Sequence, residues 1–242
     1  MIWTLRIATA ALVSLPLLGS GALAHAGEII VAAGADKATP AAYSRDASGV
    51  CRRTYATPVA GGWRIDGTSG DDVIVVSTER IERVCGFAGV RPIDLGSRAS
   101  LFVYGNGGDD VIWGGGPRLS AFGMYLSGGG GHDILYAGGV MTDFDGGSGN
   151  DQILMDGSVT SASGGSGSDL FCSAVDGVFA RQGVHYVYGG PGSDHYYGEI
   201  SFATGSTSVS NDVNDPTQRD RCSLSYLAAF YSALDLTSRE TR

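Results

Sequence analysis

The chain has 242 residues, of which 39 are glycine, and its formal net charge is −9. This acidic balance argues against nucleic-acid binding, which needs a basic surface. Because 43% of the residues are apolar, the chain can bury a core and is not a disordered glycine-rich tract. The glycines therefore serve backbone geometry inside a folded domain.

Residues 1–26 have the features of a secretory signal peptide. Arg6 precedes an apolar run from Ile7 to Leu18, and the small residues around Ala24 supply a cleavage site. The run is shorter than the ~20 residues that a membrane span needs. We therefore expect export to the periplasm or the cell exterior, with no transmembrane segment after the signal peptide is removed.

The four cysteines, Cys51, Cys85, Cys172 and Cys222, are even in number and bound for an oxidising compartment. Two disulfides are therefore expected, and three connectivities are open. We favour Cys51–Cys85 with Cys172–Cys222, because each pair flanks one end of the repeats described next. A zinc site would need closely spaced ligands such as CxxC, and the sequence has none.

A nine-residue motif occurs six times between residues 67 and 197, and one copy is GGSGNDQIL from Gly146. Position 4 is always Gly, position 6 is always Asp, and position 8 is always a large apolar residue. The position-6 residues are Asp72, Asp110, Asp133, Asp151, Asp169 and Asp194. The position-8 residues are Ile74, Ile112, Leu135, Ile153, Phe171 and Tyr196. Glycine at positions 1 and 4 would allow the positive φ of a tight reversal.

The aspartates are separated by 38, 23, 18, 18 and 25 residues, which indicates a basic period of 18 with insertions. The spacing of 38 suggests one more coil, without the motif, around residues 80–97. An apolar residue also stands two positions before each motif: Ile65, Val103, Leu126, Phe144, Ala162 and Val187.

Each period therefore reads as strand, Gly-rich turn, strand and plain turn, with both apolar columns facing one interior. Because such short strands have no core of their own, the coils must stack to bury one. We predict an all-β fold, a parallel β-roll or β-helix solenoid of about six to seven coils, over residues 63–199.

The segments on either side of the repeats are expected to be caps. Residues 27–62 would form an N-terminal cap or linker, and residues 200–242 a C-terminal cap. Within the latter, residues 223–236 have the periodicity of an amphipathic helix.

The position-9 residues are predicted to face away from the core as a partly aromatic stripe. This stripe could bind carbohydrate, or the C-terminal helix could cover it; we favour the second alternative. Its members are Val75, Trp113, Tyr136, Leu154, Cys172 and Tyr197.

The Gly-rich turns carry an excess of acid. Between Gly105 and Glu199 there are ten Asp and one Glu against two Arg. Stacked coils would place the six position-6 carboxylates about 4.8 Å apart, where like charges repel. A divalent cation would neutralise them, and calcium suits the oxygen ligands and irregular geometry of such turns. The expected ligands are these six aspartates and backbone carbonyls of the turns that begin at Gly105, Gly128, Gly146, Gly164 and Gly189. The alternative is that each Asp merely caps nearby backbone N–H groups.

The motif GGxGxDxUx resembles the RTX, or hemolysin-type, calcium-binding repeat, and the resemblance covers about residues 63–199. It implies a parallel β-roll with calcium bound between adjacent turns. Because the motif recurs here about every 18 residues rather than every nine, we expect one binding edge instead of two.

The sequence contains no HExxH, GxSxG or P-loop pattern, and caps of this size could not house a catalytic domain. We therefore expect a non-enzymatic, exported protein in which calcium binding is coupled to folding. Two other functions remain open: an adhesion or glycan-binding module that uses the position-9 stripe, and an enzyme that acts on polysaccharide.

Overall fold

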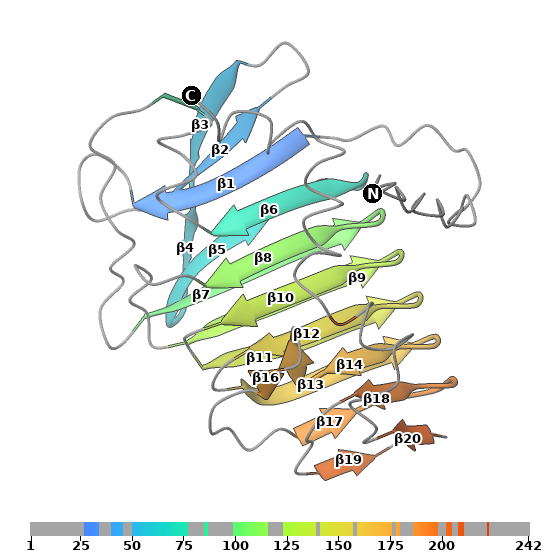
Figure 1. Ribbon diagram of the computed structural model, residues 1–242. Helices are drawn as coiled ribbons and strands as arrows, with labels where there is room; N and C mark the ends of the chain where they lie inside the picture. The colour runs from blue at the N-terminus through green and yellow to red at the C-terminus, as the bar shows by residue number, and fades with distance from the viewer. Residues whose placement is uncertain are drawn as a thin grey trace, which may run out of the picture.

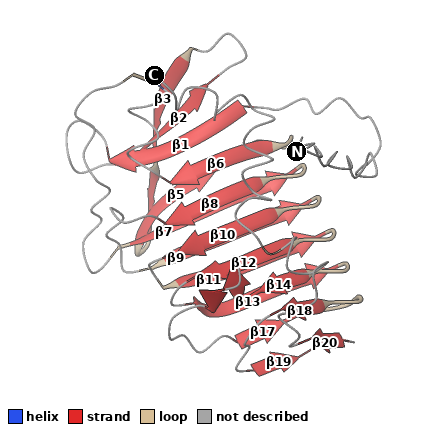
Figure 2. Cartoon of the chain, viewed as in Figure 1, coloured by secondary structure: helices blue, strands red, loops and turns tan. Residues whose placement is uncertain are grey.

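The computed structural model describes residues 27–33, 40–45, 50–76, 85–86, 99–115, 123–138, 141–156, 159–175, 178–179, 186–197, 202–204, 208–210 and 222. Every element in these ranges is a β-strand (Figure 2). Among them, no helix is long and apolar enough to span a membrane. Residues 1–26, with the expected signal peptide, and residues 223–236, with the expected helix, lie outside the described part.

The strands form two large sheets, here called sheet A and sheet B, and one small hairpin (Figure 1). Sheet A contains, in spatial order, β20 (Ser208–Ser210), β18 (His195–Tyr197), β14 (Leu170–Cys172), β12 (Gln152–Asp156), β10 (Ile134–Gly138), β8 (Val111–Gly115), β6 (Asp72–Val76), β1 (Gly27–Ala33), β2 (Pro40–Arg45) and β3 (Cys51–Tyr55). Sheet B contains β19 (Phe202–Thr204), β17 (Tyr186–Tyr188), β13 (Val159–Ser166), β11 (Thr142–Ser148), β9 (Met124–Gly130), β7 (Ser100–Gly107), β5 (Gly62–Asp66) and β4 (Thr57–Val59). The hairpin joins β15 (Ala174–Val175) to β16 (Val178–Phe179).

From β5 onward the chain alternates between sheet B and sheet A, except at the β15–β16 hairpin. Each motif copy ends or directly follows a sheet B strand, makes the turn and begins the next sheet A strand. Within each sheet the successive strands of this region pair in parallel, for example β10 with both β8 and β12. At the N-terminal end the pairing becomes antiparallel, between β1, β2 and β3 and between β4 and β5. Both sheets are therefore mixed.

The two apolar columns expected from the sequence form the interior. The position-8 residues stand side by side across sheet A, as in the pairs Ile112–Leu135 and Leu135–Ile153, and all six are buried. The column two residues before each motif is aligned in the same way across sheet B and is also buried. All twelve side chains belong to one hydrophobic cluster. The prediction of a shared interior is confirmed.

The extra coil expected around residues 80–97 is absent from the stack. β6 pairs directly with β8, and β5 pairs directly with β7, so no strand intervenes between the first two motif coils in either sheet. The spacing of 38 residues is therefore an insertion in the connection from sheet A to sheet B. The strands β19 and β20 instead extend the stack beyond the last motif.

The outer face of sheet A is covered. The position-9 residues alternate with the core column, as predicted, but all of them are buried except Trp113, which is partly buried. Cys172 of this stripe is bonded to Cys222, which lies 50 residues further along the chain and is itself buried. The second disulfide joins Cys51 to Cys85. The favoured disulfide pairing is confirmed, and an exposed aromatic stripe is not found.

Candidate metal centre

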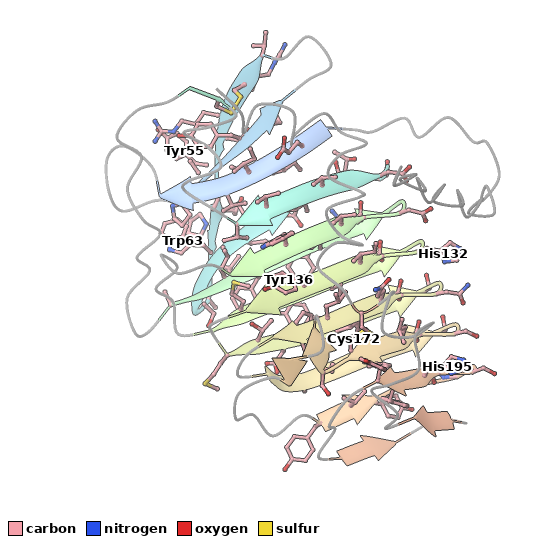
Figure 3. All side chains as sticks on the ribbon, viewed as in Figure 1. Tyr55, Trp63, His132, Tyr136, Cys172 and His195 are labelled. Atoms are coloured by element: carbon pink, nitrogen blue, oxygen red, sulfur yellow. A yellow bond between two sulfur atoms is a disulfide. The ribbon has the colours of Figure 1, made fainter. Side chains whose placement is uncertain are left out.

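The six Gly-rich turns line up along one edge of the two sheets, the edge at which His132 and His195 are labelled in Figure 3. Each position-6 aspartate stands at the start of a sheet A strand or directly before it. In-register pairing of these strands therefore sets the six aspartates in a row. Although carboxylates are rarely buried without partners, none of the six is more than 1% exposed. The row predicted from the sequence is present.

One oxygen of each carboxylate, from Asp110 to Asp194, bonds to the backbone of the preceding coil. Its Oδ1 accepts a hydrogen bond from the N–H of the preceding position-6 aspartate. The five bonds run from Asp72, Asp110, Asp133, Asp151 and Asp169 N–H to the Oδ1 atoms of Asp110, Asp133, Asp151, Asp169 and Asp194, at 2.7–3.0 Å. The aspartates therefore cap backbone N–H groups, but between coils rather than within one turn.

The second oxygen has no such bond in the middle of the row. The Oδ2 atoms of Asp110, Asp133, Asp151 and Asp169 are buried and have no hydrogen-bond partner within the described part of the chain. A buried carboxylate oxygen left in this way is costly unless a proton or a cation meets it. Each of these four oxygens therefore needs a proton or a cation beside it.

Glycine at position 1 makes room for this second oxygen. A Cβ on Gly105 or Gly146 would clash with the Oδ2 of the aspartate in the same turn. The same Cβ would stand 2.6 Å from the Gly128 carbonyl oxygen in the first case and 2.5 Å from the Gly164 carbonyl oxygen in the second. A carboxylate oxygen and a carbonyl oxygen from the next coil therefore approach the same small space, and a side chain would fill it.

The glycines that need a positive φ are those at positions 2 and 4, so the expectation for position 1 was wrong. Gly147 and Gly149 have φ of 106° and 130°, and the equivalent residues of the later turns are similar. Asn106 holds position 2 at φ 78°, a conformation that Asn tolerates better than other residues with a side chain. Position 1 is glycine because of the carboxylate beside it, a reason that no sequence pattern reveals.

The first turn is different. Its position 2 is Thr68, whose N–H and Oγ1 lie 2.5 and 3.0 Å from the Oδ2 of Asp72. Asp72 therefore has its inner oxygen bonded within its own turn. Its other oxygen, Oδ1, points where a preceding motif turn would stand, and there it has no hydrogen-bond partner in the described residues.

A second ladder, formed by the position-5 side chains, runs beside the first on the exposed side of the turns. Here each side chain accepts a hydrogen bond from the N–H of the next coil, the reverse of the carboxylate row. The acceptors are Asp71, Asp109, His132 and Asn150, and the donors are the N–H groups of Asp109, His132, Asn150 and Ser168, at 2.7–2.8 Å. The direction of these hydrogen bonds could not be read from the sequence.

Burial dominates the electrostatics of the row. It raises the pKa of Asp110 to about 8, that of Asp133 and Asp151 to about 7, and that of Asp169 to about 6. The N–H bond from the preceding coil lowers each pKa, and neighbouring carboxylates raise it again. Without a cation, Asp110 therefore keeps its proton at pH 7, Asp133 and Asp151 are partly protonated, and Asp169 is mostly ionised.

Few acidic side chains of the row lie close enough together to bind the same ion. Within the described residues, no three Asp, Glu, His or Cys side chains converge as a metal-binding group. The reason is geometric, since each coil contributes one inner carboxylate and only two coils can flank a point. A cation here would have to be held by carboxylates of adjacent coils together with backbone carbonyl oxygens, a donor set that suits calcium rather than a soft metal.

A scan of the chain against protein-family models finds no match, and searches of the curated proteins and of the solved structures find none either. The resemblance to the RTX repeat therefore rests on the six motif copies alone.

Proposed function

We propose that this is a calcium-binding protein whose Gly-rich turns hold calcium ions between adjacent coils of a β-roll. One observation carries the proposal: the buried Oδ2 atoms of Asp110, Asp133, Asp151 and Asp169 have no hydrogen-bond partner in the described residues. The turns that begin at Gly105, Gly128, Gly146, Gly164 and Gly189 would supply carbonyl oxygens. The ligands would thus be hard, anionic or neutral oxygens, which calcium prefers.

The rival occupant of this space is the proton. Each carboxyl group could stay neutral and donate its O–H to the nearby carbonyl oxygen. Calcium gains on the proton as the pH rises through these pKa values, because the protons leave and the buried negative charges, one strand apart, then need a cation. Calcium binding would therefore release protons and stabilise the fold at the same time.

The setting supports an exported scaffold. The two disulfides are consistent with a location outside the cytoplasm, and calcium at the ~10⁻⁴–10⁻³ M affinities of extracellular modules would bind only after export. Folding and metal binding would then be linked to arrival outside the cell.

The other two candidate functions receive less support. A glycan-binding stripe at position 9 would need exposed rings, but Tyr136 and Tyr197 are buried. An enzyme acting on polysaccharide would need acids that reach the substrate, but the position-6 aspartates are at most 1% exposed.

The test is a titration of the chain without residues 1–26, with both disulfides formed, first with calcium and then separately with magnesium. We expect calcium in the millimolar range to raise the midpoint of chemical unfolding and to increase the strand signal in far-UV circular dichroism. Magnesium should do so weakly, because it demands near-octahedral geometry and keeps its waters.

Isothermal titration calorimetry in two buffers of different ionisation enthalpy provides the control. Calcium binding to the row at pH 7 should release protons, so the apparent enthalpy should differ between the buffers. A chain that is equally stable in chelator and in 10 mM calcium, with no heat of binding, would overturn the proposal and leave the aspartates as protonated caps.

A further inference from the structure

A side-chain hydroxyl group lies at each end of the carboxylate row, and the two hydroxyl groups make different contacts. In the turns that begin at Gly105, Gly146 and Gly164, the first glycine lies beside the Oδ2 of its own aspartate and beside a carbonyl oxygen from the next coil. The first turn has no motif coil before it, and the last has no motif coil after it. Residues 205–210, after the last motif, read GSTSVS and contain no Asp.

In the first turn, Thr68 occupies the position that is Asn or Gly in the later turns. A β-branched residue strongly disfavours positive φ, and Thr68 is not among the residues that adopt it. Its backbone N–H therefore points inward, to 2.5 Å from the Oδ2 of Asp72, and its Oγ1 adds a second donor at 3.0 Å. Two donors satisfy this oxygen, and their positive ends oppose a cation beside it.

In the last turn, Tyr196 replaces the carbonyl group that a next motif coil would bring. A Cβ placed on Gly164 would stand 2.8 Å from the carbonyl oxygen of Gly189. A Cβ placed on Gly189 would stand 2.8 Å from the hydroxyl oxygen of Tyr196 and would also clash with the Oδ2 of Asp194. The hydroxyl oxygen is thus as close to the first glycine of its turn as the carbonyl oxygen is in the preceding turn.

Packing holds the hydroxyl group in this place. Tyr196 is the last residue of the position-8 column. The side chains of the other five members contain no oxygen: Ile74, Ile112, Leu135, Ile153 and Phe171. Its ring stacks on that of Phe171 with centroids 5.0 Å apart and planes 9° apart, and only 1% of the residue is exposed. Position 8, a core position, therefore carries a polar side-chain atom only in the last motif copy.

We propose that Tyr196 supplies an oxygen ligand to a cation in the last turn, whereas Thr68 closes the first turn so that it takes no ion. This inference rests on the proposed calcium function and assigns which turns use it. The turns from Gly105 to Gly189 bind, and the turn from Gly67 does not. A neutral phenol oxygen is a suitable hard ligand because its lone pairs are available while the proton stays in place.

The test counts bound calcium by native mass spectrometry and by equilibrium dialysis on the disulfide-bonded chain without residues 1–26. Tyr196→Phe removes one oxygen and keeps the ring stacking, and we expect one ion fewer, or one site weakened at least tenfold. Thr68→Gly allows the first turn to adopt the geometry of the others, and we expect one ion more. The matched controls are Tyr188→Phe, at a residue 54% exposed, and Ser69→Gly, at the neighbouring position of the same turn; neither should change the count.

The outcomes separate the two proposals. If the unaltered chain binds no calcium, the proposed function fails. If it binds calcium and Tyr196→Phe leaves both the count and the weakest affinity unchanged, the role of Tyr196 is overturned and the function stands. If Thr68→Gly folds, as judged by circular dichroism, and gains no ion, the role of Thr68 is overturned.

Discussion

The backbone N–H of Asp110 donates to the Oδ1 of Asp133 at 2.8 Å, across 23 residues of chain and from one coil to the next. Beside it, the N–H of His132 donates in the opposite direction, to the Oδ1 of Asp109, at 2.7 Å. In the turns from Gly105 to Gly164, the position-5 N–H therefore donates to the preceding coil and the position-6 N–H donates to the next coil. The bond from the N–H of Asp110 uses only the Oδ1 of Asp133. The Oδ2 of Asp133 is the oxygen to which the proposed function assigns a calcium ion.

The first prediction concerns the pH dependence of stability without calcium. The pKa values of Asp110, Asp133, Asp151 and Asp169 are raised in the folded chain to between about 6 and about 8, against an ordinary value near 3.9. The folded state therefore holds more protons than the unfolded state between about pH 4 and pH 8. In chelator, the contribution of these groups is fully present below about pH 4 and is lost as the pH rises through 6 to 8.

Chemical unfolding in chelator at pH 5, 6, 7 and 8 measures this trend, and the same series in 10 mM calcium is its control. We expect the unfolding midpoint in chelator to fall steadily, and the difference between calcium and chelator to widen as the pH rises, because calcium replaces protons. Stability in chelator that rises between pH 5 and pH 8 would show that these carboxyl groups are ionised in the folded chain.

The second prediction concerns Asp151→Asn. Asn keeps the size of the side chain, its oxygen can accept the N–H of Asp133, and its NH₂ can donate to the carbonyl oxygen of Gly164. In chelator at pH 8 we expect the variant to be more stable than the parent, because a satisfied amide replaces an ionised carboxylate. In calcium it should lose the stabilisation of about one site, about 2.7 kcal/mol at a calcium concentration 100 times the dissociation constant.

Urea unfolding of parent and variant, each with and without calcium, gives the four free energies of this cycle. The exposed Asp66, which pairs with Arg64 outside the turns, offers the control substitution Asp66→Asn. Its effect should be the same in both conditions. An Asp151→Asn effect that is also independent of calcium would mean that this carboxylate only caps the backbone.

The third prediction separates two glycines of the same turn. In Gly105→Ala the new methyl group would clash with the Oδ2 of Asp110, so we expect a loss of about 1–3 kcal/mol and weaker calcium binding. In Gly107→Ala the nearest atom to the new methyl group is 3.8 Å away, so the change should be within about 0.5 kcal/mol. Thermal unfolding in calcium compares the two variants, and equal losses would show that position 1 is not shaped by the carboxylate.

Much of this arrangement could be predicted because the repeat fixes three columns at once. An apolar residue at position 8, another two residues before the motif and Asp at position 6 determine the interior, the register and the acid row. The disulfide Cys172–Cys222 was inferred from the flanking positions alone and is present. The sequence also favoured a covered stripe, because residues 223–236, after the repeats, have the periodicity of an amphipathic helix that could lie across it.

The details of the turns could not be predicted, since they depend on distances between coils. Gly105 and Gly107 are the same residue type two positions apart, yet only the first faces a carboxylate. The spacing of 38 residues between Asp72 and Asp110 suggested a missing coil, but a coil and a long insertion give the same spacing. Only the direct pairing of Val73 with Val111 decides between them.

The last prediction concerns His132, the only imidazole in the outer ladder. Its Nδ1 accepts a hydrogen bond from the N–H of Asn150 at 2.8 Å. His132→Asn keeps an acceptor of the kind that Asn150 uses in the next coil, whereas His132→Leu removes it. We expect His132→Leu to cost about 0.5–1.5 kcal/mol and His132→Asn much less, measured by urea unfolding in saturating calcium at pH 8. Because the loss lies outside the carboxylate row, the number of bound calcium ions should not change. A fall in that number for His132→Leu alone would show that the two ladders act as one unit.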